Sequence, residues 1–325
     1  MPAVSVVIPV HNAAPYLPAL FQALVAQALA DLEFILIDDG SSDGSAALLD
    51  GFVAAEPRAQ LIRHATPQGV SRARNAGITV ARGRYIGFCD ADDVPAPQLW
   101  SSLLAAAEAE QLDVVLCNGR RFEGEPSDSA PLLARRPKPE GVLSGRNWLV
   151  HSIEQGEYLV MVYLTLVARR LFEGGALRFV PAIVHEDVLW MTDLLLHTQR
   201  LRYLNQPLYH YRRTPGSITE GHSEQRACER VAGYAVVIDT LLRWSDDSRE
   251  PRLAGALRAQ ARANARHLLA LAERQTSSPA RRRVAAVIAR HGLLRLLWQR
   301  AQGLGDRRRI ARVWMAAKLA RPTYD

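Results

Sequence analysis

A cluster of carboxylates follows a short apolar run near the first third of the chain: Asp90, Asp92 and Asp93, with Ala91 between the first two. Two carboxylates at alternate positions beyond a strand end can hold a divalent cation against a diphosphate, because Mg²⁺ and Mn²⁺ prefer hard oxygen ligands. This much like charge in one loop requires a cation or hydrogen-bond donors to compensate it. The structural alternative is that Asp92 or Asp93 caps a helix beginning near Pro97.

A second polar turn, DDGSSDGS, begins at Asp38 and Asp39. Asp, Gly and Ser form turns and cap the following helix without any ligand, which is one explanation for this segment. The other is functional: a carboxylate beyond a strand accepts hydrogen bonds from a nucleotide base or a ribose hydroxyl. The D-x-D-x-D-G spacing and the bidentate Glu of an EF-hand are missing, so a calcium loop is excluded.

Two arginines, Arg72 and Arg74, lie in the segment GVSRARNAG, in which Ser71 is the expected N-cap of a helix. Positive side chains in the first turn of a helix oppose its dipole. Their presence there indicates that the guanidinium groups face an anion. The alternative is an ordinary position on the protein surface.

A third acidic pair, Glu186 and Asp187, stands at the start of an apolar helical segment. A carboxylate in this position can act as a general base that removes a proton from an attacking hydroxyl group. Acidic residues at a helix start are also ordinary partners of the helix dipole. The pair alone therefore leaves both explanations open.

Short β-branched runs alternate with helical segments over the first 120 residues, which predicts an α/β fold with a mostly parallel sheet and right-handed crossovers. Ligands in such sheets bind beyond the carboxyl ends of the strands. We therefore expect three polar loops, including Pro9, His11 and Asn12 after the first strand, to converge on one edge. A helix is expected around 16–25, and Pro97 is expected in the first turn of another. The predicted strands cover residues 4–8, 34–37, 85–88 and 113–116.

Composition limits the class of protein. The chain has 325 residues, of which 48% are hydrophobic and 22% charged, enough for one or two domains with a sizeable core. Its three cysteines are too few and too scattered for a disulfide framework or a zinc ribbon. The apolar N-terminal segment has no basic region and is typical of a buried strand rather than a secretory signal. No uncharged apolar run is long enough to span a membrane, so we expect a cytoplasmic protein.

Charge divides the chain near residue 220. Residues 221–325 hold 21 Arg and Lys against 9 Asp and Glu, a balance of +12, whereas residues 1–220 hold 19 against 24, a balance of −5. The net charge of +7 is the sum of the two, and the basic character belongs to the later part. The segment 124–141 is rich in Pro, Ser and charge, which predicts an exposed loop. The sequence from about 222 onward is rich in Ala, Leu and Arg and is predicted to be helical throughout.

Three segments within residues 3–93 resemble glycosyltransferase family 2, whose members invert the configuration at the transferred sugar. They are VSVVIPVHNAAPYL, EFILIDDGSSDGS and GVSRARNAGITVARGRYIGFCDADD, in that order. HEDVLW and YHYRRTPGSIT resemble later family segments, so the resemblance covers about 1–220. It implies the GT-A fold, a Rossmann-like nucleotide-diphospho-sugar transferase domain. The all-helical extension predicted at 221–325 lies outside the resemblance. Nucleotide-sugar binding would fall in 1–120 and the acceptor side in 121–220.

The resemblance also implies positions for the donor nucleotide. Asp39 would accept from the base, with Asp38 as the near alternative, and His11 replaces an aromatic residue common in the family. Which of Arg212 and Arg213 faces the diphosphate stays open. The expected donor-binding residues are Pro9, His11, Asn12, Asp38, Asp39, Arg72, Arg74, Asn75, Asp90, Ala91, Arg212 and Arg213.

The same resemblance implies the chemistry. Asp90-Ala91-Asp92 matches the DXD motif, so Asp92, with Asp90, would hold the Mg²⁺ or Mn²⁺ that bridges the diphosphate. Asp187 would be the catalytic base, and Glu186 would assist it or take that role. A single displacement then converts an α-linked donor into a β-linked product.

The implied enzyme is a metal-dependent hexosyl- or N-acetylhexosaminyltransferase. It would use a nucleotide sugar, with a UDP-sugar expected, and a glycan or lipid-linked acceptor in cell-envelope polysaccharide synthesis. A nucleotidyltransferase that makes the sugar nucleotide is one alternative, but it should have a Gly-rich, Lys-containing phosphate loop, which PVHNAAPYL lacks. A binding module without activity is another, and it should have lost one of the carboxylates.

The C-terminal segment suggests a further partner. Residues 279–325 carry 12 basic and 2 acidic side chains, with apolar residues between the arginines. Such a helix either lies on an anionic membrane surface, which would make the protein peripheral on the inner face of the cell membrane, or packs on the catalytic domain or on a second copy. Nucleic acid is a poor fit, because no recognition motif accompanies the charge.

Overall fold

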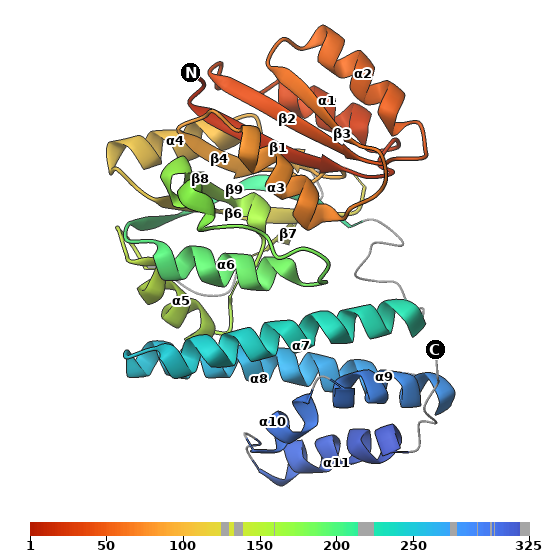
Figure 1. Cartoon of the computed structure of the whole chain (residues 1–325). Coiled ribbons are helices and arrows are strands. Elements are labelled where there is room, and N and C mark those ends of the chain that lie inside the picture. The colour runs from red at the N-terminus through yellow and green to blue at the C-terminus, as the bar shows by residue number, and fades with distance from the viewer. Residues whose placement is uncertain are drawn as a thin grey trace. The chain divides into compact units, whose positions relative to one another are not determined.

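A nine-stranded mixed sheet forms the centre of the first part of the chain (Figure 1). The strand order is β3-β2-β1-β4-β8-β6-β9-β5, and β7 pairs with β6. The strands β3, β2, β1 and β4 are parallel, and β8 runs antiparallel to both β4 and β6. The α/β fold class is therefore confirmed. The strands are β1 (Val4–Val10), β2 (Leu32–Asp39), β3 (Ala59–His64), β4 (Tyr85–Phe88), β5 (Val94–Pro95), β6 (Val114–Phe122), β7 (Ala130–Pro131), β8 (Thr165–Ala168) and β9 (Leu201–Arg212).

The structure is a computed structural model and describes residues 1–124, 130–132, 139–158, 160–213, 224–273, 278–290, 292–299, 301 and 303–318. Contacts divide the chain into two units. The first unit contains Met1–Pro181 and Trp190–Pro215, and the second contains Ala182–Leu189 and Gly216–Asp325. Parts of two predicted segments, the loop at 124–141 and YHYRRTPGSIT, lie outside the described residues, as do residues 319–325.

Helices cover both faces of the sheet in the first unit. Val4, Val6 and Ile8 of β1 share a buried cluster with Leu17 and other residues of α1, because alternate side chains of a strand point to the same face. Val7, on the opposite face, meets α3: a Cβ added at Gly77 would lie 2.5 Å from Val7 Cγ1, so glycine allows this close approach. The α-helices are α1 (Leu17–Val25), α2 (Ser45–Ala55), α3 (Val70–Val80), α4 (Leu99–Ala109), α5 (Gly145–Glu154) and α6 (Glu186–His197).

Two predicted helix starts are wrong. Ser71 is buried inside the first turn of α3, and the N-cap is Gly69 with φ of +91°, a conformation that favours glycine. Pro97 precedes the N-cap of α4, Gln98, and so lies outside the helix rather than in its first turn. The strand β3 was not predicted, because its residues are only partly buried and carry no apolar alternation.

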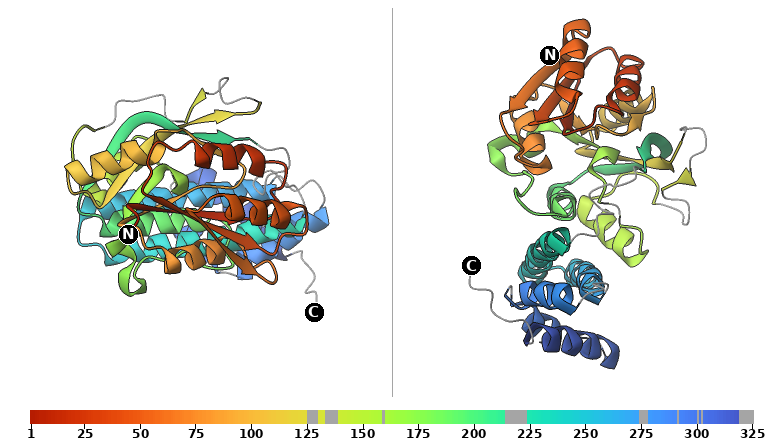
Figure 2. Two further views of the ribbon diagram at one scale, coloured as in Figure 1. Left: turned by 90° about the horizontal axis from the view of Figure 1, so that it is seen from above. Right: turned by 90° about the vertical axis from the view of Figure 1, so that its right-hand side faces the viewer.

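The described residues of the second unit from 224 onward are mostly helical (Figure 2). Its core includes Val237 of α7, Leu257 of α8, Ile288 of α9 and Val313 of α11. Among the residues that the structure describes, none of the helices is both long enough and apolar enough to cross a membrane. The helices are α7 (Glu224–Asp247), α8 (Pro251–Glu273), α9 (Ser278–Arg290), α10 (Leu293–Gln299) and α11 (Leu304–Lys318).

Candidate functional site

The carboxyl ends of three adjacent parallel strands bring the predicted polar loops together. The strand β1 lies between β2 and β4, with Val10 opposite Asp38 on one side and Val7 opposite Phe88 on the other. The loops that start at His11, Asp39 and Asp90 therefore leave the same edge of the sheet. This is the edge at which ligands bind in sheets of this type.

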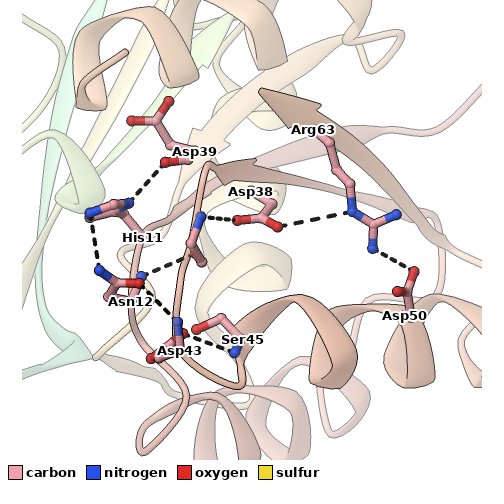
Figure 3. A network of polar contacts seen from close by, with 9 residues as sticks. His11, Asn12, Asp38, Asp39, Asp43, Ser45, Asp50 and Arg63 are labelled. Carbon is pink, nitrogen blue, oxygen red and sulfur yellow. Dashed lines mark hydrogen bonds and ion pairs between the residues drawn. The ribbon is translucent and has the colours of Figure 1, made fainter. Parts of the chain in front are cut away.

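Asn12 connects the loop after β1 to the turn after β2 (Figure 3). Its side-chain oxygen accepts a hydrogen bond from the backbone N–H of Ser42 at 2.7 Å. The Nδ1 atom of His11 lies 2.8 Å from the backbone oxygen of Asp39, so Nδ1 is the donor, and Nε2 is the acceptor for the Asn12 amide at 3.3 Å in the neutral ring. Asn12 has a φ of +51°, which asparagine tolerates better than most residues. These contacts fix the shape of both loops.

The buried Asp38 carboxylate also shapes this turn. It accepts a hydrogen bond from the Ser41 N–H at 3.0 Å, an arrangement typical of an Asx turn. Arg63 of β3 lies 3.9 Å from its other oxygen and forms a second ion pair with Asp50 at 2.6 Å. Both oxygens of the Asp38 carboxylate therefore have partners within the protein, as Figure 3 shows.

Asp39 is a buried carboxylate with three donors. It accepts from His64 Nδ1 at 2.7 Å and from the N–H groups of Gln68 at 2.9 Å and Gly69 at 2.7 Å. Burial alone would raise the pKa of Asp39, but these hydrogen bonds and the adjacent imidazole outweigh it and lower the pKa below its ordinary value. Asp39 is therefore ionised at neutral pH. His64 was missed from the sequence, because its strand was not predicted.

The helix α3 contributes one buried arginine and one exposed arginine. Arg74 Nη2 donates to Asp90 Oδ1 at 2.9 Å, and its guanidinium carbon lies 5.2 Å from the centre of the Phe179 ring. Asn75 forms two hydrogen bonds with the backbone of Phe179, at 2.8 and 2.9 Å. Arg72 is exposed, and its side chain has no polar partner among the described residues. The arginines in this helical turn predicted a nearby anion, and for Arg74 the Asp90 carboxylate is one such anion.

Asp93 is the buried member of the acidic loop, and the interpretation of Asp92 or Asp93 as a helix cap is wrong. The oxygens of Asp93 accept from the Tyr209 hydroxyl at 2.8 Å and from the Arg212 N–H at 2.7 Å. The N-cap position of α4 is occupied by Gln98 instead, without a side-chain capping hydrogen bond. Burial, then the negative charges of Asp90 and Asp92, raise the pKa of Asp93 well above its ordinary value. Tyr209, which the sequence did not single out, also accepts from the Asp90 N–H at 3.0 Å.

The two consecutive arginines at the end of β9 point to different partners. Arg212 Nε donates to the backbone oxygen of Asp92 at 2.9 Å, and its guanidinium carbon lies 4.6 Å from the centre of the Phe122 ring. Arg213 is exposed and pairs with Glu123 at 2.9 Å. Arg212 is therefore the arginine that contacts the acidic loop.

The acidic loop fits a divalent cation that takes most of its ligands from a substrate. No group of three or more His, Cys, Asp and Glu side chains is arranged to hold a metal ion within the described ranges. Asp90 and Asp92 supply hard carboxylate oxygens, and Asp90 shares one of them with Arg74. Magnesium sites of this type use one or two carboxylates, with phosphate and water oxygens completing the shell.

Glu186 and Asp187 belong to the second unit, at the start of α6. Asp187 Oδ1 accepts from the Val188 N–H at 2.9 Å. The preceding residue, His185, has a φ of +69° and stacks on the Tyr234 ring of α7 with the ring centres 4.0 Å apart. Burial, followed by the charges of Arg230 and His267, lowers the pKa of His185 to about 4. This packing fixes the backbone just before both carboxylates.

Comparison with known proteins identifies a family and relatives. The family model described as Glycosyl transferase family 2 matches residues 5–155. The uncharacterized glycosyltransferase YibD of Escherichia coli is 32% identical over 223 residues, and EpsJ of Bacillus subtilis, also described as an uncharacterized glycosyltransferase, is 33% identical over 224 residues. Each match covers 68% of this chain and 64% of the relative. The succinoglycan biosynthesis protein ExoO of Rhizobium meliloti is 30% identical over 230 residues, covering 67% of this chain and 63% of that protein. The matched part thus spans just under two thirds of each of these relatives.

Solved structures share the fold at low sequence identity. S. aureus TarS 1–349 in complex with UDP-GlcNAc superposes with a TM-score of 0.61 at 17% identity, covering 100% of this chain and 94% of that one. A mannosyltransferase of Pyrobaculum calidifontis in complex with GDP-Man and Mn²⁺ gives a TM-score of 0.54 at 19% identity, covering 98% and 86%.

Proposed function

The chain belongs to glycosyltransferase family 2, and on this premise we propose that it transfers a sugar from a nucleotide-diphospho-sugar to a hydroxyl group of a glycan or lipid-linked acceptor. The observation that carries the proposal is that Arg212 contacts the Asp90–Asp93 loop, which follows β4, the strand paired with β1. A basic side chain and carboxylates together can hold a diphosphate and a divalent cation. The proposed product belongs to cell-envelope polysaccharide, and the transferred group is a hexose or an N-acetylhexosamine.

Asp39 is proposed to recognise the nucleotide base. Its Oδ2 atom has one donor among the described contacts, the Gly69 N–H, so this oxygen keeps an acceptor position for a base N–H. Because its pKa is lowered, the carboxylate accepts without protonation at neutral pH. Pro9 and His11 would border the base from the neighbouring loop. A UDP-sugar is the proposed donor, in line with the UDP-GlcNAc complex of TarS.

The diphosphate is proposed to meet Arg212 and the exposed Arg72 at the first turn of α3. Asp92, with Asp90, would hold Mg²⁺ or Mn²⁺. When bound, the cation supplies Lewis-acid stabilisation of the charge that develops on the nucleoside diphosphate. Arg212 adds a fixed positive charge for the same leaving group.

Asp187 is proposed as the general base, with Glu186 assisting it or taking that role. The carboxylate removes the proton of the acceptor hydroxyl group while the hydroxyl oxygen forms a bond to the anomeric carbon of the donor sugar. The bond from that carbon to the donor phosphate breaks on the opposite side, and the nucleoside diphosphate leaves. The α-linked donor thus gives a β-linked product in a single displacement.

The test is incubation of the full chain with a panel of UDP- and GDP-sugars, with Mn²⁺ or Mg²⁺, while following release of the nucleoside diphosphate. Release from one donor, increased by a glycan acceptor, is expected. Pyrophosphate formation from a nucleoside triphosphate and a sugar 1-phosphate would instead favour a nucleotidyltransferase. Binding of a donor without any turnover would favour a module that lacks activity.

A further inference from the structure

The last described helix, α11, has two contrasting sides. Ile310 and Val313 are 3% and 4% exposed, and by helical spacing Asp306 and Ala317 fall on their side. The other side, here called the outer face of α11, carries large apolar residues: Leu304 is 71% exposed, Met315 53% and Trp314 48%. The outer face consists of Leu304, Arg307, Arg308, Ala311, Trp314, Met315 and Lys318.

The cations of this face lie among its apolar side chains. Lys318 Nζ is 3.7 Å from the centre of the Trp314 ring. Arg307 lies over the ring of Trp298, which is 48% exposed on the neighbouring helix α10, with 5.9 Å between the guanidinium carbon and the ring centre. Tryptophan and the long stems of Lys and Arg have an apolar body and a polar end, and both are frequent at membrane interfaces.

We propose that the outer face of α11, together with Trp298, docks on the surface of an anionic membrane. The helix would lie in the interface plane, with Leu304, Trp314 and Met315 entering the boundary between headgroups and acyl chains. Its arginines and lysine would meet lipid phosphates. The proposal concerns a surface of the second unit alone and does not require the proposed sugar transfer.

Charge selects a membrane over the other partners. The outer face has three cations and no carboxylate, so two copies of it facing each other across a two-fold axis would place like charges together. Nucleic acid would pair with the cations but leave the apolar residues in water. An anionic lipid surface satisfies both kinds of side chain, because phosphates lie above hydrocarbon.

The test measures binding of the full chain to vesicles by co-sedimentation and by tryptophan emission. Vesicles of phosphatidylcholine with about one third phosphatidylglycerol are compared with phosphatidylcholine alone. We expect binding to the anionic vesicles, a blue shift of the emission, and weaker binding in high salt. Equal binding to both kinds of vesicle would overturn the electrostatic part of the argument and the proposal with it.

Matched variants locate the surface. Arg308→Glu reverses one exposed charge on the outer face, and Arg249→Glu reverses one exposed charge between α7 and α8. Because each basic residue near an anionic surface contributes about fivefold in affinity, Arg308→Glu should weaken vesicle binding by about tenfold or more, and Arg249→Glu by much less. If the two reversals weaken binding equally, the outer face is not the docking surface.

The apolar residues are tested separately. The double variant Leu304→Ser, Met315→Ser should lose the emission shift and most vesicle binding, while Val25→Ser, at a 56% exposed position of α1, should not. Sedimentation velocity without lipid gives the competing outcome. Self-association that disappears in the double variant, with no vesicle binding by the unchanged chain, would assign the face to contact between copies and overturn the membrane proposal.

Discussion

Arg212 donates a hydrogen bond from Nε to the backbone oxygen of Asp92, whereas the adjacent Arg213 pairs with Glu123 on the surface. Consecutive residues of an extended strand point to opposite sides, so only one of them can reach the acidic loop. The backbone N–H of Arg212 also donates to Asp93 and ties the end of β9 to the same loop. One side chain thus places a positive charge beside the proposed cation site.

Arg212→Ala should reduce kcat for sugar transfer by about a hundredfold, because a fixed charge facing the leaving group stabilises the transition state. The backbone hydrogen bond to Asp93 is retained in this variant. Arg213→Ala, the matched control, should stay within about threefold of the unchanged enzyme, since its exposed side chain pairs with Glu123 on the surface. Steady-state kinetics with the best donor of the panel decide the point. Equal losses in the two variants would refute the assignment.

Asp92→Asn should raise the Mn²⁺ concentration needed for half-maximal activity by at least about tenfold. Removing a residue that only hydrogen-bonds to a metal ligand typically lowers metal affinity by about tenfold or more, and a direct ligand should matter at least as much. Chelation should abolish activity of the unchanged enzyme, and added Mn²⁺ or Mg²⁺ should restore it. Asp50→Asn, on the exposed side of α2, is the control and should leave the metal titration unchanged. An enzyme fully active in chelator would contradict a cation role for Asp92.

Asp187→Asn should lower kcat by about a thousandfold while donor affinity stays the same, because the amide cannot accept the acceptor proton. Asparagine keeps an oxygen for the Val188 N–H, so the helix start is preserved. Asp193→Asn, on the same helix and paired with His197, serves as control. If Asp187→Asn turns over normally and Glu186→Gln does not, the base is Glu186.

The polar loops of the candidate site could be predicted from the sequence because buried parallel strands have a plain signature. β1 and β2 are runs of β-branched and apolar residues, and their carboxyl ends are marked by His11 and Asp39. The edge strand β3 has no such signature, since most of its residues are half-exposed, and His64 was lost with it. The position of His64 opposite Asp39 depends on how β3 pairs with β2, which local sequence does not encode.

Other parts of the site depend on contacts between residues that are distant along the chain. Tyr209 reaches Asp93 from more than a hundred residues away, and its importance follows only from the fold. The start of α3 at Gly69 rather than Ser71 reflects the close fit of Gly69 N–H to the Asp39 carboxylate. A tertiary contact there outweighs the ordinary capping preference of serine.

His185 predicts an acid-sensitive second unit. Its pKa of about 4 lies below the ordinary value of 6.5, so the unfolded chain binds a proton first as pH falls. The contribution of neutral His185 to the free energy of unfolding is complete above about pH 6.5 and is lost as pH falls towards 4. The loss amounts to about 2 kcal/mol between pH 7 and pH 5. The charges of Arg230 and His267 further disfavour protonation of His185. The negative charge of Asp187 contributes to a raised pKa of Tyr234, the ring stacked on His185.

Urea unfolding at pH 7 and pH 5 measures this effect. The test variant is His185→Asn, because asparagine tolerates the φ of +69° at this position. This variant should be less stable than the unchanged chain at pH 7, but on acidification its free energy of unfolding should fall by about 2 kcal/mol less. An identical pH dependence in both proteins would show that His185 is not the responsible group.

Gly233 of α7 tests whether the backbone before Asp187 must be held in place. A Cβ at this position would collide with the backbone oxygen of Val184, three residues before Asp187, whereas a Cβ at Gly255 of α8 would meet nothing within 4 Å. Gly255→Ala should therefore stabilise the protein by up to about 1 kcal/mol through helix propensity, and Gly233→Ala should destabilise it by about 2 kcal/mol. Because the displaced segment carries Glu186 and Asp187, Gly233→Ala should also lower kcat at temperatures where it remains folded, with donor affinity unchanged. A stabilised, fully active Gly233→Ala would mean that this contact neither holds the segment nor supports the proposed base.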